Sequence, residues 1–263
     1  ANVQALGADT AQFAIIQGLF GSYAATGTGP VTAPQTNMRS VSMLWQNVEQ
    51  FVVANQYAKT GTAADLVAMK GMTMGFGKQN SGTIGSNRVL LKGLGLDMAK
   101  DFKLMHGGYG PTADALANGQ VAGIGAPSGP PTGAITKLMA SNAAKFTMLT
   151  VTPDEAKKMD GGRNLWVPYT IKAGTYPGQT KDLLTIAQPN FLAVNADVSE
   201  EHVYLLTKAI YENLPFLQAI HKATKAMNVQ AATAGAAPPG CCALLQRSRG
   251  RYSGPPDGKV VFV

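Results

Sequence analysis

The stretch from Met72 to Leu94, MTMGFGKQNSGTIGSNRVLLKGL, combines a short apolar run, a glycine-punctuated loop and an amphipathic segment. This order predicts a strand, a loop and a helix. Gly75 and Gly77 allow backbone conformations that other residues avoid, and Ser81 and Thr83 place hydroxyls beside the helix start. Because the first turn carries no acid, its unpaired N–H groups and the positive end of the helix dipole favour a carboxylate, sulfonate or phosphate.

An ordinary capped turn, with Asn80 or Ser81 as the N-cap, explains the same residues, since Gly-rich turns between strand and helix occur in most α/β proteins. The loop GFGKQNSG is not a P-loop, because no GK[ST] follows the glycines, and it lacks GxGxxG spacing. Nucleotide binding is therefore disfavoured.

Helical and extended patterns alternate on both sides of this loop. The predicted helices cover residues 64–69, 81–94, 112–117 and 132–140, and the predicted strands cover 72–76, 102–106, 121–125 and 145–150. Such alternation predicts a parallel sheet covered by helices. Ligands of these sheets lie at the carboxyl ends of the strands, so the loops 77–83, 107–111 and 126–131 are candidate binding loops. Ser128 adds a hydroxyl to the third, although a proline-stiffened helix start explains that loop as well.

Two segments nearer the start of the chain carry further polar candidates. FAIIQ, Phe13–Gln17, predicts a buried parallel strand that ends in an amide, either a ligand contact or a structural amide bonded to backbone. Trp45 and Gln46 interrupt an apolar pattern between Ser40 and Ala54, which suggests a strand end beside a polar ligand. A half-buried tryptophan at a sheet edge is the alternative.

The clearest helical periodicity lies at residues 197–217. Apolar residues recur at helical spacing at Val203, Leu206, Ile210, Leu214 and Leu217, and they are predicted to be core. Further caps are predicted at Thr112, with Asp114 in the first turn, and in the sequence Thr-Pro-Asp-Glu that begins at Thr152.

Composition narrows the class of protein. The 263 residues are 45% hydrophobic and 14% charged, enough for one or two compact units. The formal charge is +7, but the basic residues are scattered singly, which argues against nucleic acid and is compatible with an anionic ligand. No run of about 18 apolar residues predicts a membrane span. The chain begins without the pattern of an export signal, so any such signal is expected to be absent from it.

The cysteines and histidines predict neither a metal site nor a cofactor. Cys241 and Cys242 are adjacent, with Cα atoms about 3.8 Å apart, which is below the disulfide range. His106, His202 and His221 show no ligand spacing. Both cysteines fall in residues 241–263, a tail predicted to be aberrant and disordered because it lacks an apolar period.

Four motifs carry a resemblance to a known family. They are FAIIQ, KQNSGTIG, VPYTIKAGTYPGQTKDLLTIA at 167–187 and DVSEEHVYLLTKAIYENL at 197–214. Together they resemble the TAXI family of solute receptors, the extracytoplasmic binding proteins of tripartite ATP-independent periplasmic (TRAP) transporters. The likeness runs through roughly residues 10 to 228, and AGTYPGQ is its most specific part.

The resemblance implies an α/β, two-lobed periplasmic-binding-protein-like (type II) fold with the ligand between the lobes. Lobe I would comprise residues 1–62 and the return segment 166–240, and lobe II residues 63–165. It also implies a periplasmic location and membrane transporter subunits of a TRAP system as partners. Two departures stand out. A TGGTGG-like strand and loop have no counterpart before Ala1, so the N-terminal part of lobe I is expected to be missing. The tail after about residue 240 departs from the family text, which suggests a frame-shifted translation.

The leading hypothesis is a non-catalytic receptor for a small organic anion, an amino acid or another carboxylate. Its predicted ligand residues are Gln17, Trp45, Gln46, Ser81, Gly82, Thr83, Ser128 and Tyr176. The rival is a small-molecule enzyme, a transferase or lyase, on a similar scaffold, for which His106 is the only plausible base at a strand end. The effector-sensing half of a regulator is a third hypothesis, and it would need a DNA-binding module that this sequence lacks.

Overall fold

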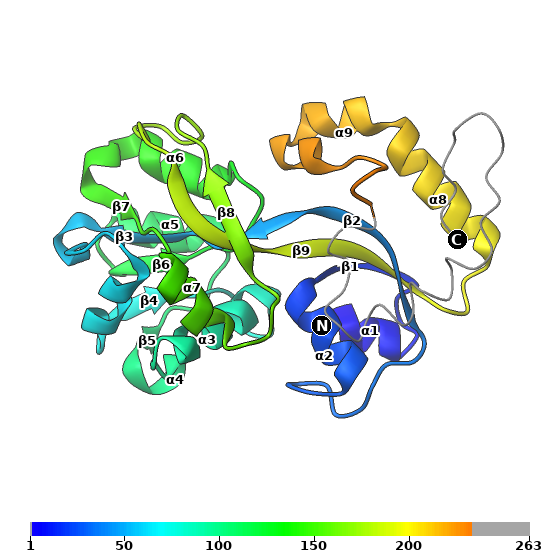
Figure 1. Cartoon of the computed structure of the whole chain (residues 1–263). Helices are drawn as coiled ribbons and strands as arrows, with labels where there is room; N and C mark the ends of the chain where they lie inside the picture. Colours follow the sequence, from blue (N-terminus) through cyan, green and yellow to red (C-terminus); the bar gives the residue numbers. More distant parts are fainter. Residues whose placement is uncertain (1, 233–263) are drawn as a thin grey trace. The chain divides into compact units, whose positions relative to one another are not determined.

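A computed structural model describes residues 2–232 of the chain, which divides into two compact units (Figure 1). Unit 1 holds the residues up to 46 and those from 188 onward, and unit 2 holds residues 47–187. The boundaries fall inside two long strands, β2 (Met38–Val48) and β9 (Leu183–Asn195). The predicted boundaries, after 62 and before 166, differ because 47–62 and 166–187 pack within unit 2. The prediction for residues 241–263 lies outside the described residues.

Unit 2 contains a five-stranded sheet in the order β5-β4-β6-β3-β7. The strands are β3 (Phe51–Ala54), β4 (Thr73–Gly75), β5 (Lys103–Leu104), β6 (Gly123–Gly125) and β7 (Phe146–Met148). β4 runs parallel to β5 and β6, as predicted, but β3 runs antiparallel to β6 and β7. The prediction of a wholly parallel sheet is therefore wrong. β3 is a short apolar strand, Phe51–Ala54, and an apolar run of this length carries no information about strand direction.

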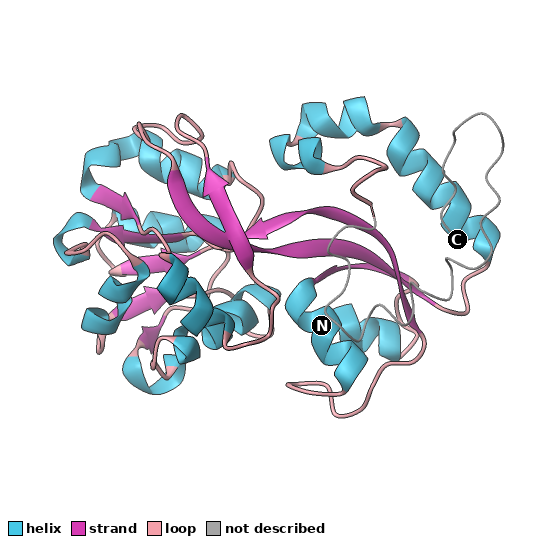
Figure 2. Cartoon of the chain, in the orientation of Figure 1, coloured by secondary structure: helices cyan, strands magenta, loops and turns pink. Residues whose placement is uncertain are grey.

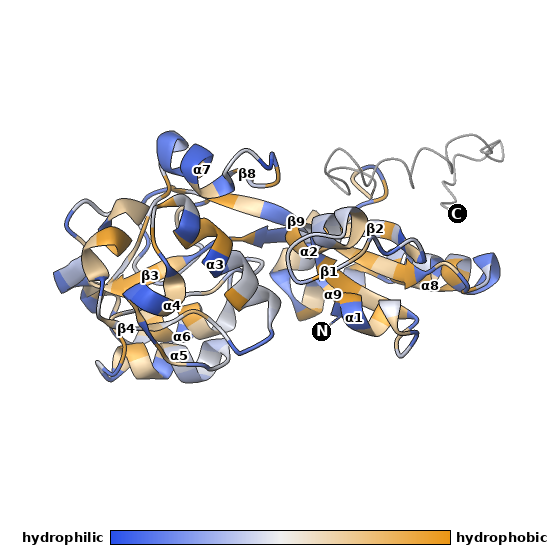
Figure 3. Cartoon of the chain, turned by 90° about the horizontal axis from the view of Figure 1, so that it is seen from below, coloured by the Kyte–Doolittle hydropathy of each residue, from blue (hydrophilic) through white to orange (hydrophobic). Residues whose placement is uncertain are grey.

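Helices cover both faces of this sheet. They are α3 (Gly82–Gly93), α4 (Met98–Asp101), α5 (Tyr109–Ala117), α6 (Gly133–Asn142) and α7 (Pro153–Asp160), with 3₁₀ segments η1 (Asn55–Tyr57), η2 (Ala63–Met69) and η3 (Ala143–Lys145). α3 and α7 pack together on one face, and α5 and α6 on the other (Figures 1 and 3). The alternation of strand and helix predicted from residue 63 is confirmed, except that the segment predicted as helix 64–69 is a 3₁₀ turn (Figure 2).

The helix starts of unit 2 agree with the predicted caps in two cases out of three. Ser81 caps α3, and Thr152 with Glu155 forms a capping box that opens α7. The third cap, Thr112, is wrong, because α5 already begins at Tyr109 and Thr112 donates its hydroxyl back to the carbonyl of Gly108. Glycine and proline in the sequence YGP suggested a loop, yet proline is well tolerated in a first helical turn.

The core of unit 2 lies between the sheet and the helices. Val52, Ile124 and Ile135, from β3, β6 and α6, are at most 1% exposed. Figure 3 shows β3 in hydrophobic colours and α7 in hydrophilic ones. α7 therefore contributes mainly caps and charge at the surface, whereas β3 supplies the centre of the core.

Unit 1 is built on β1 (Phe13–Gln17), β9 and β2, in that order. β1 pairs antiparallel with β9, Phe13 opposite Val194, and only Ile16 of β1 is buried. The prediction of a buried parallel strand is correct in its bounds and wrong in its direction and burial. An apolar run of five residues carries no information about strand direction.

Helices flank both faces of the unit 1 sheet: α1 (Asn2–Gly7), α2 (Gly18–Thr26), α8 (Glu200–Glu212), α9 (Leu214–Ile220) and the 3₁₀ segment η4 (Lys222–Ala226). Side chains alternate along β9, so Phe191 packs in the cluster with α1 and α2, while Leu192 packs in the cluster that α8 covers. Leu206, Ile210 and Leu214 are half-buried and pack against the second cluster. Val203 and Leu217 are half-buried too, so the predicted core positions are covered only in part.

The predicted helix at 197–217 is two helices. α8 ends at Glu212, and α9 begins at Leu214 with a proline, Pro215, in its first turn. Proline removes a backbone donor and is tolerated only at a helix start, so the break falls at Asn213.

The sequence analysis also predicted that a strand ends at Trp45 and Gln46, and this prediction is wrong. Trp45, Gln46 and Asn47 lie inside β2, which continues to Val48. Polar side chains do not end a strand, because the hydrogen bonds between neighbouring strands join backbone groups.

Candidate ligand-binding site

Three loops follow the carboxyl ends of the parallel strands β4, β6 and β5 and lead into α3, α6 and α5. They span residues 76–81, 126–132 and 105–108. None of the three helices has an acid in its first turn, whereas α7 and α8 have two each. Three helix N-termini with uncompensated positive ends therefore lie at one edge of the sheet, an arrangement that suits an anion.

The start of α3 is built as a cap. The hydroxyl of Ser81 accepts from the N–H of Ile84 at 3.2 Å and donates to the carbonyl of Lys78 at 2.7 Å. Gly77 has φ +111°, and a Cβ there would lie 2.7 Å from Cγ2 of Thr83, so the loop requires glycine at this position. Ser81, Gly82 and Thr83 are all half-buried at this edge.

Tyr109 joins all three loops. Its hydroxyl lies 2.9 Å from the hydroxyl of Thr83 and donates to the carbonyl of Pro127. Burial raises the pKa of Tyr109, the hydrogen bond from Thr83 opposes that shift, and the negative charge of Glu49 adds to it. The phenol is therefore neutral at neutral pH and can donate to Pro127 while it accepts from Thr83. The sequence does not predict this role of Tyr109, because YGP is typical of a loop.

The three loops carry two ionisable side chains, Lys78 and His106, and no acid. Both are exposed, and Nδ1 of His106 lies 3.4 Å from the carbonyl oxygen of Gly77. The charge of Lys78 thus has the same sign as the helix N-termini, whereas the charge of Glu49, which acts on Tyr109, has the opposite sign.

Asn87 fixes the spacing of two of the strand ends. It is fully buried on α3, and its Nδ2 donates to the carbonyls of Phe76 and Gly125, each at 3.1 Å. A Cβ at Gly125 would lie 2.6 Å from Oδ1 of Asn87, so only glycine fits there. The sequence signal for Asn87 is a lone amide among the apolar positions of the helix.

The side chain of Gln50 holds the loop 126–132 in shape through hydrogen bonds. Its Nε2 donates to Oγ of Ser128 at 3.1 Å and to Oγ1 of Thr132 at 3.0 Å. Its Oε1 accepts from the hydroxyl of Tyr176, which in turn accepts from the N–H of Thr132 at 2.9 Å. Ser128 and Tyr176, both predicted ligand residues, therefore use their hydroxyls within unit 2, and Tyr176 is only 2% exposed.

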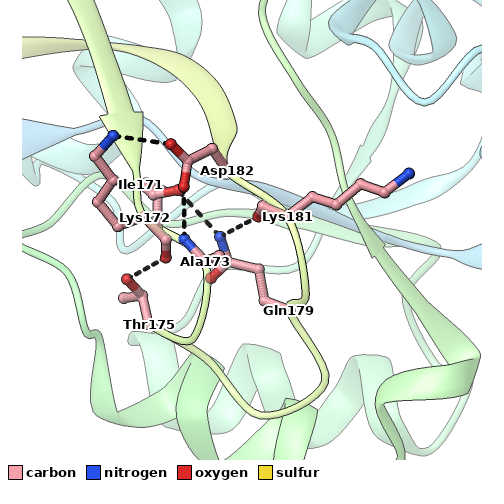
Figure 4. Close-up of polar contacts among 7 residues, drawn as sticks. All are labelled: Ile171, Lys172, Ala173, Thr175, Gln179, Lys181 and Asp182. Atoms are coloured by element: carbon pink, nitrogen blue, oxygen red, sulfur yellow. Dashed lines mark hydrogen bonds and ion pairs between the residues drawn. The ribbon is translucent and has the colours of Figure 1, made fainter.

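The hairpin between β8 (Val167–Ile171) and β9 carries Tyr176, whose N–H donates to Oε1 of Gln179 at 3.2 Å. Figure 4 shows the other polar contacts of this hairpin. Asp182 pairs with Nζ of Lys172 at 2.8 Å and accepts from the N–H of Ala173 at 2.9 Å. Gln179 donates to the carbonyls of Ile171 and Lys181 at 3.1 and 3.0 Å. These bonds give the AGTYPGQ motif a structural role.

A buried carboxylate lies next to Gln50. Glu49 is 1% exposed, and its Oε1 accepts from Nε1 of Trp166 at 2.8 Å. Its negative charge acts on Tyr109, so a ligand anion at the three loops meets both this repulsion and the attraction of the helix N-termini.

The remaining predicted ligand residues belong to unit 1. Gln17 ends β1 opposite Asn190, and Trp45 packs against the cluster of Leu44, Leu192 and Met227. Oε1 of Gln46 is buried and has no hydrogen-bond partner among residues 2–232. The structure thus brings together Ser81, Gly82 and Thr83 with the loop of Ser128 in unit 2, and it places Gln17, Trp45 and Gln46 in the other unit.

Within the described part of the chain, no group of three or more His, Cys, Asp and Glu side chains is placed to hold a metal ion. The helices of residues 2–232 are also too short or too polar for any of them to cross a bilayer.

Comparison with solved structures gives distant likenesses. A protein from Bordetella bronchiseptica RB50 is 16% identical, with a TM-score of 0.52 over 98% of this chain and 70% of that one. The binding protein component of an ABC phosphonate transporter from Pseudomonas aeruginosa is 14% identical, with a TM-score of 0.47 over 80% of this chain. PhnD1 from Prochlorococcus marinus, solved with methylphosphonate, is also 14% identical, with a TM-score of 0.47 over 86% of this chain and 73% of that one. This chain spans 59% of the length of the Pseudomonas protein.

The fold is α/β, with helices on both faces of its sheets, which confirms the predicted fold class at that level. The chain belongs to the NMT1-like family, whose model matches residues 1–239. The finer resemblance to TAXI receptors stays a prediction.

Proposed function

We propose that this protein is an extracytoplasmic solute receptor that captures a small organic anion, an amino acid or another carboxylate, without converting it. The observation that carries the proposal is the convergence of three helix N-termini, all without first-turn acids, at the carboxyl edge of β4, β5 and β6. Membership of the NMT1-like family supports it.

Ser81, Gly82 and Thr83 form the centre of the proposed site. Backbone N–H groups of the first turn of α3 bind the anionic group, and Lys78 adds positive charge at the rim. Ser128 and Tyr176 hold the loop 126–132 in shape rather than meet the ligand through their hydroxyls. We keep Gln17, Trp45 and Gln46 as proposed contacts from unit 1.

Delivery to the membrane subunits of a TRAP transporter, and hence a periplasmic location, rests on the resemblance of the AGTYPGQ and KQNSGTIG motifs to TAXI receptors. We propose no catalytic role. His106, the base that the rival hypothesis needs, faces the backbone carbonyl of Gly77, and no hydroxyl or carboxylate bonds to its ring within residues 2–232.

Two measurements test the proposal. Mass spectrometry of material released from the purified protein identifies a retained ligand. Calorimetry with succinate, L-glutamate, methylphosphonate and methanesulfonate then compares carboxylates with phosphonate and sulfonate. We expect a carboxylate to bind and to be recovered unchanged after hours of incubation. Chemical conversion that is lost in His106→Ala would favour an enzyme instead.

A further inference from the structure

We propose that the hydroxyl of Thr83 meets the ligand as a hydrogen-bond acceptor, so that the protein selects small acids that carry a hydroxyl or ammonium group beside the anionic group. Thr83 is then a specificity-determining residue. This inference rests on the proposed function and narrows its substrate class to acids that have a hydrogen-bond donor of their own.

The directions of two hydrogen bonds follow from the protons that are available. A carbonyl oxygen has no proton to give, so the hydroxyl of Tyr109 donates its single proton to Pro127. The hydroxyl of Thr83 lies 2.9 Å from that of Tyr109 and is therefore the donor between the two. This order requires a neutral phenol, and burial, which raises the pKa of Tyr109, keeps the phenol neutral at neutral pH. Thr83 thus has no proton left for a ligand.

The side chain of Thr83 is held in this orientation at the start of α3. A Cβ added at Gly77 would lie 2.7 Å from the Cγ2 methyl of Thr83, and the hydroxyl is bonded to Tyr109. A β-branched side chain has few χ1 rotamers in a helix, so these two contacts leave it little freedom to turn. Thr83 is half-buried, and no residue between 2 and 232 donates to its Oγ1. A hydrogen-bond acceptor therefore lies beside the N–H groups that we propose for the anion.

The charges around the three loops also favour a donor group on the ligand. Burial raises the pKa of Tyr109, and the negative charge of Glu49 raises it further, so the phenol lies in the field of that carboxylate. Such a field attracts the hydrogens of a hydroxyl or ammonium group and repels a second anionic group. The helix N-termini attract the first anionic group. The site therefore suits a ligand with one anionic group at the start of α3 and a donor next to it.

Pairs of acids that differ only in a donor test this inference. Calorimetry compares succinate with the two enantiomers of malate, and glutarate with the two enantiomers of glutamate. We expect the wild type to bind at least one donor-bearing acid roughly tenfold more tightly than the plain acid of the same length, because the plain acid leaves Oγ1 of Thr83 without a partner. Equal or tighter binding of both plain acids would overturn this inference while the receptor proposal stands.

Two substitutions of Thr83 assign the preference to its hydroxyl. Thr83→Val keeps the shape of the side chain and removes the acceptor, so the two affinities of a pair should come within about twofold of each other. Thr83→Ser is the matched control, because it keeps the hydroxyl and should keep the preference. A preference that persists in Thr83→Val would overturn the inference. Thr83→Ala repeats the measurement if valine prevents folding.

Tyr109→Phe tests the direction of the hydrogen bond between the two hydroxyls. Without the phenol oxygen, the proton of Thr83 is free to point at the ligand, so the preference for donor-bearing acids should fall. The readout is the ratio of two affinities, because looser loops would weaken the binding of both acids alike. An unchanged ratio in Tyr109→Phe would contradict the proposed role of the proton. A folded wild type that binds none of these acids would overturn the receptor proposal and this inference together.

Discussion

The hydroxyl oxygens of Thr83 and Tyr109 lie 2.9 Å apart, and this contact joins the loop after β4 to the helix that follows β5. Thr83 stands in the first turn of α3, where the N–H groups have no intrahelical partner. A residue at this position therefore acts both on the shape of the loops and on the electrostatic potential that a ligand meets.

Thr83→Glu should weaken anion binding by roughly tenfold or more, because it places a carboxylate at the positive end of the α3 dipole. Calorimetry with the anions named above measures the change. Ala99→Glu, an exposed position on α4, adds the same charge away from the three loops and should leave affinity unchanged. Equal affinities in the two variants would remove the start of α3 from the site.

The start of α3 could be predicted from the sequence, but the direction of strand β3 in the same unit could not. Ser81 as cap and the helical spacing after it are local signals, so both could be predicted from a few residues. The direction of β3 could not, because Phe51–Ala54 is apolar in either direction.

Polar residues of the site illustrate the same limit. The sequence predicts Ser128 and Tyr176 as ligand residues mainly from their place near strand ends, yet both hydroxyls bond to the side chain of Gln50, which is far away in the sequence. Asn87 and Tyr109 were missed, since only the tertiary structure shows that each one joins several strand ends. Long-range hydrogen bonds leave no periodic trace in a sequence.

Trp166→Phe should lower the free energy of unfolding by about 2–3 kcal/mol, because it removes a hydrogen-bond donor from the buried carboxylate of Glu49. Glu49→Gln in the same background should recover part of the loss by removing the charge. Urea unfolding of the two single variants and the double variant gives the coupling energy. Strictly additive effects would contradict a direct interaction between these side chains.

Gly93→Ala should destabilise the protein by about 1–3 kcal/mol through overpacking. A Cβ at Gly93 would lie 2.2 Å from the carbonyl oxygen of Lys158 and 2.5 Å from Cα of Met159, both backbone atoms that cannot move aside easily. Gly133→Ala is the matched control, since nothing lies within 4 Å of its Cβ position and alanine favours the helix. Thermal unfolding should separate the two variants, and equal melting temperatures would show that α3 and α7 can move apart at no cost.

Glu155 should make the stability of unit 2 depend on pH in the acid range. Its desolvation favours the neutral form, but hydrogen bonds from Thr62, Thr152 and Ala64 outweigh that effect and hold the pKa of this carboxyl below its ordinary value of 4.5. A lowered native pKa means that the unfolded chain takes up the proton first as the pH falls. The stabilisation is therefore complete above the ordinary value and is lost as the pH falls through the native one.

Glu155→Gln tests this sign. At pH 7 the variant should be less stable than the wild type by about 1–3 kcal/mol, because an amide replaces a charged acceptor that caps two segments, η2 and α7. Urea unfolding at a series of pH values should show the difference shrinking below pH 4.5, where the wild-type carboxylate begins to lose its advantage. Glu201→Gln, an exposed residue in the first turn of α8, should show a much smaller change with pH. A difference for Glu155→Gln that stays constant or grows as the pH falls would mean that the neutral acid, not the carboxylate, is the form these hydrogen bonds stabilise.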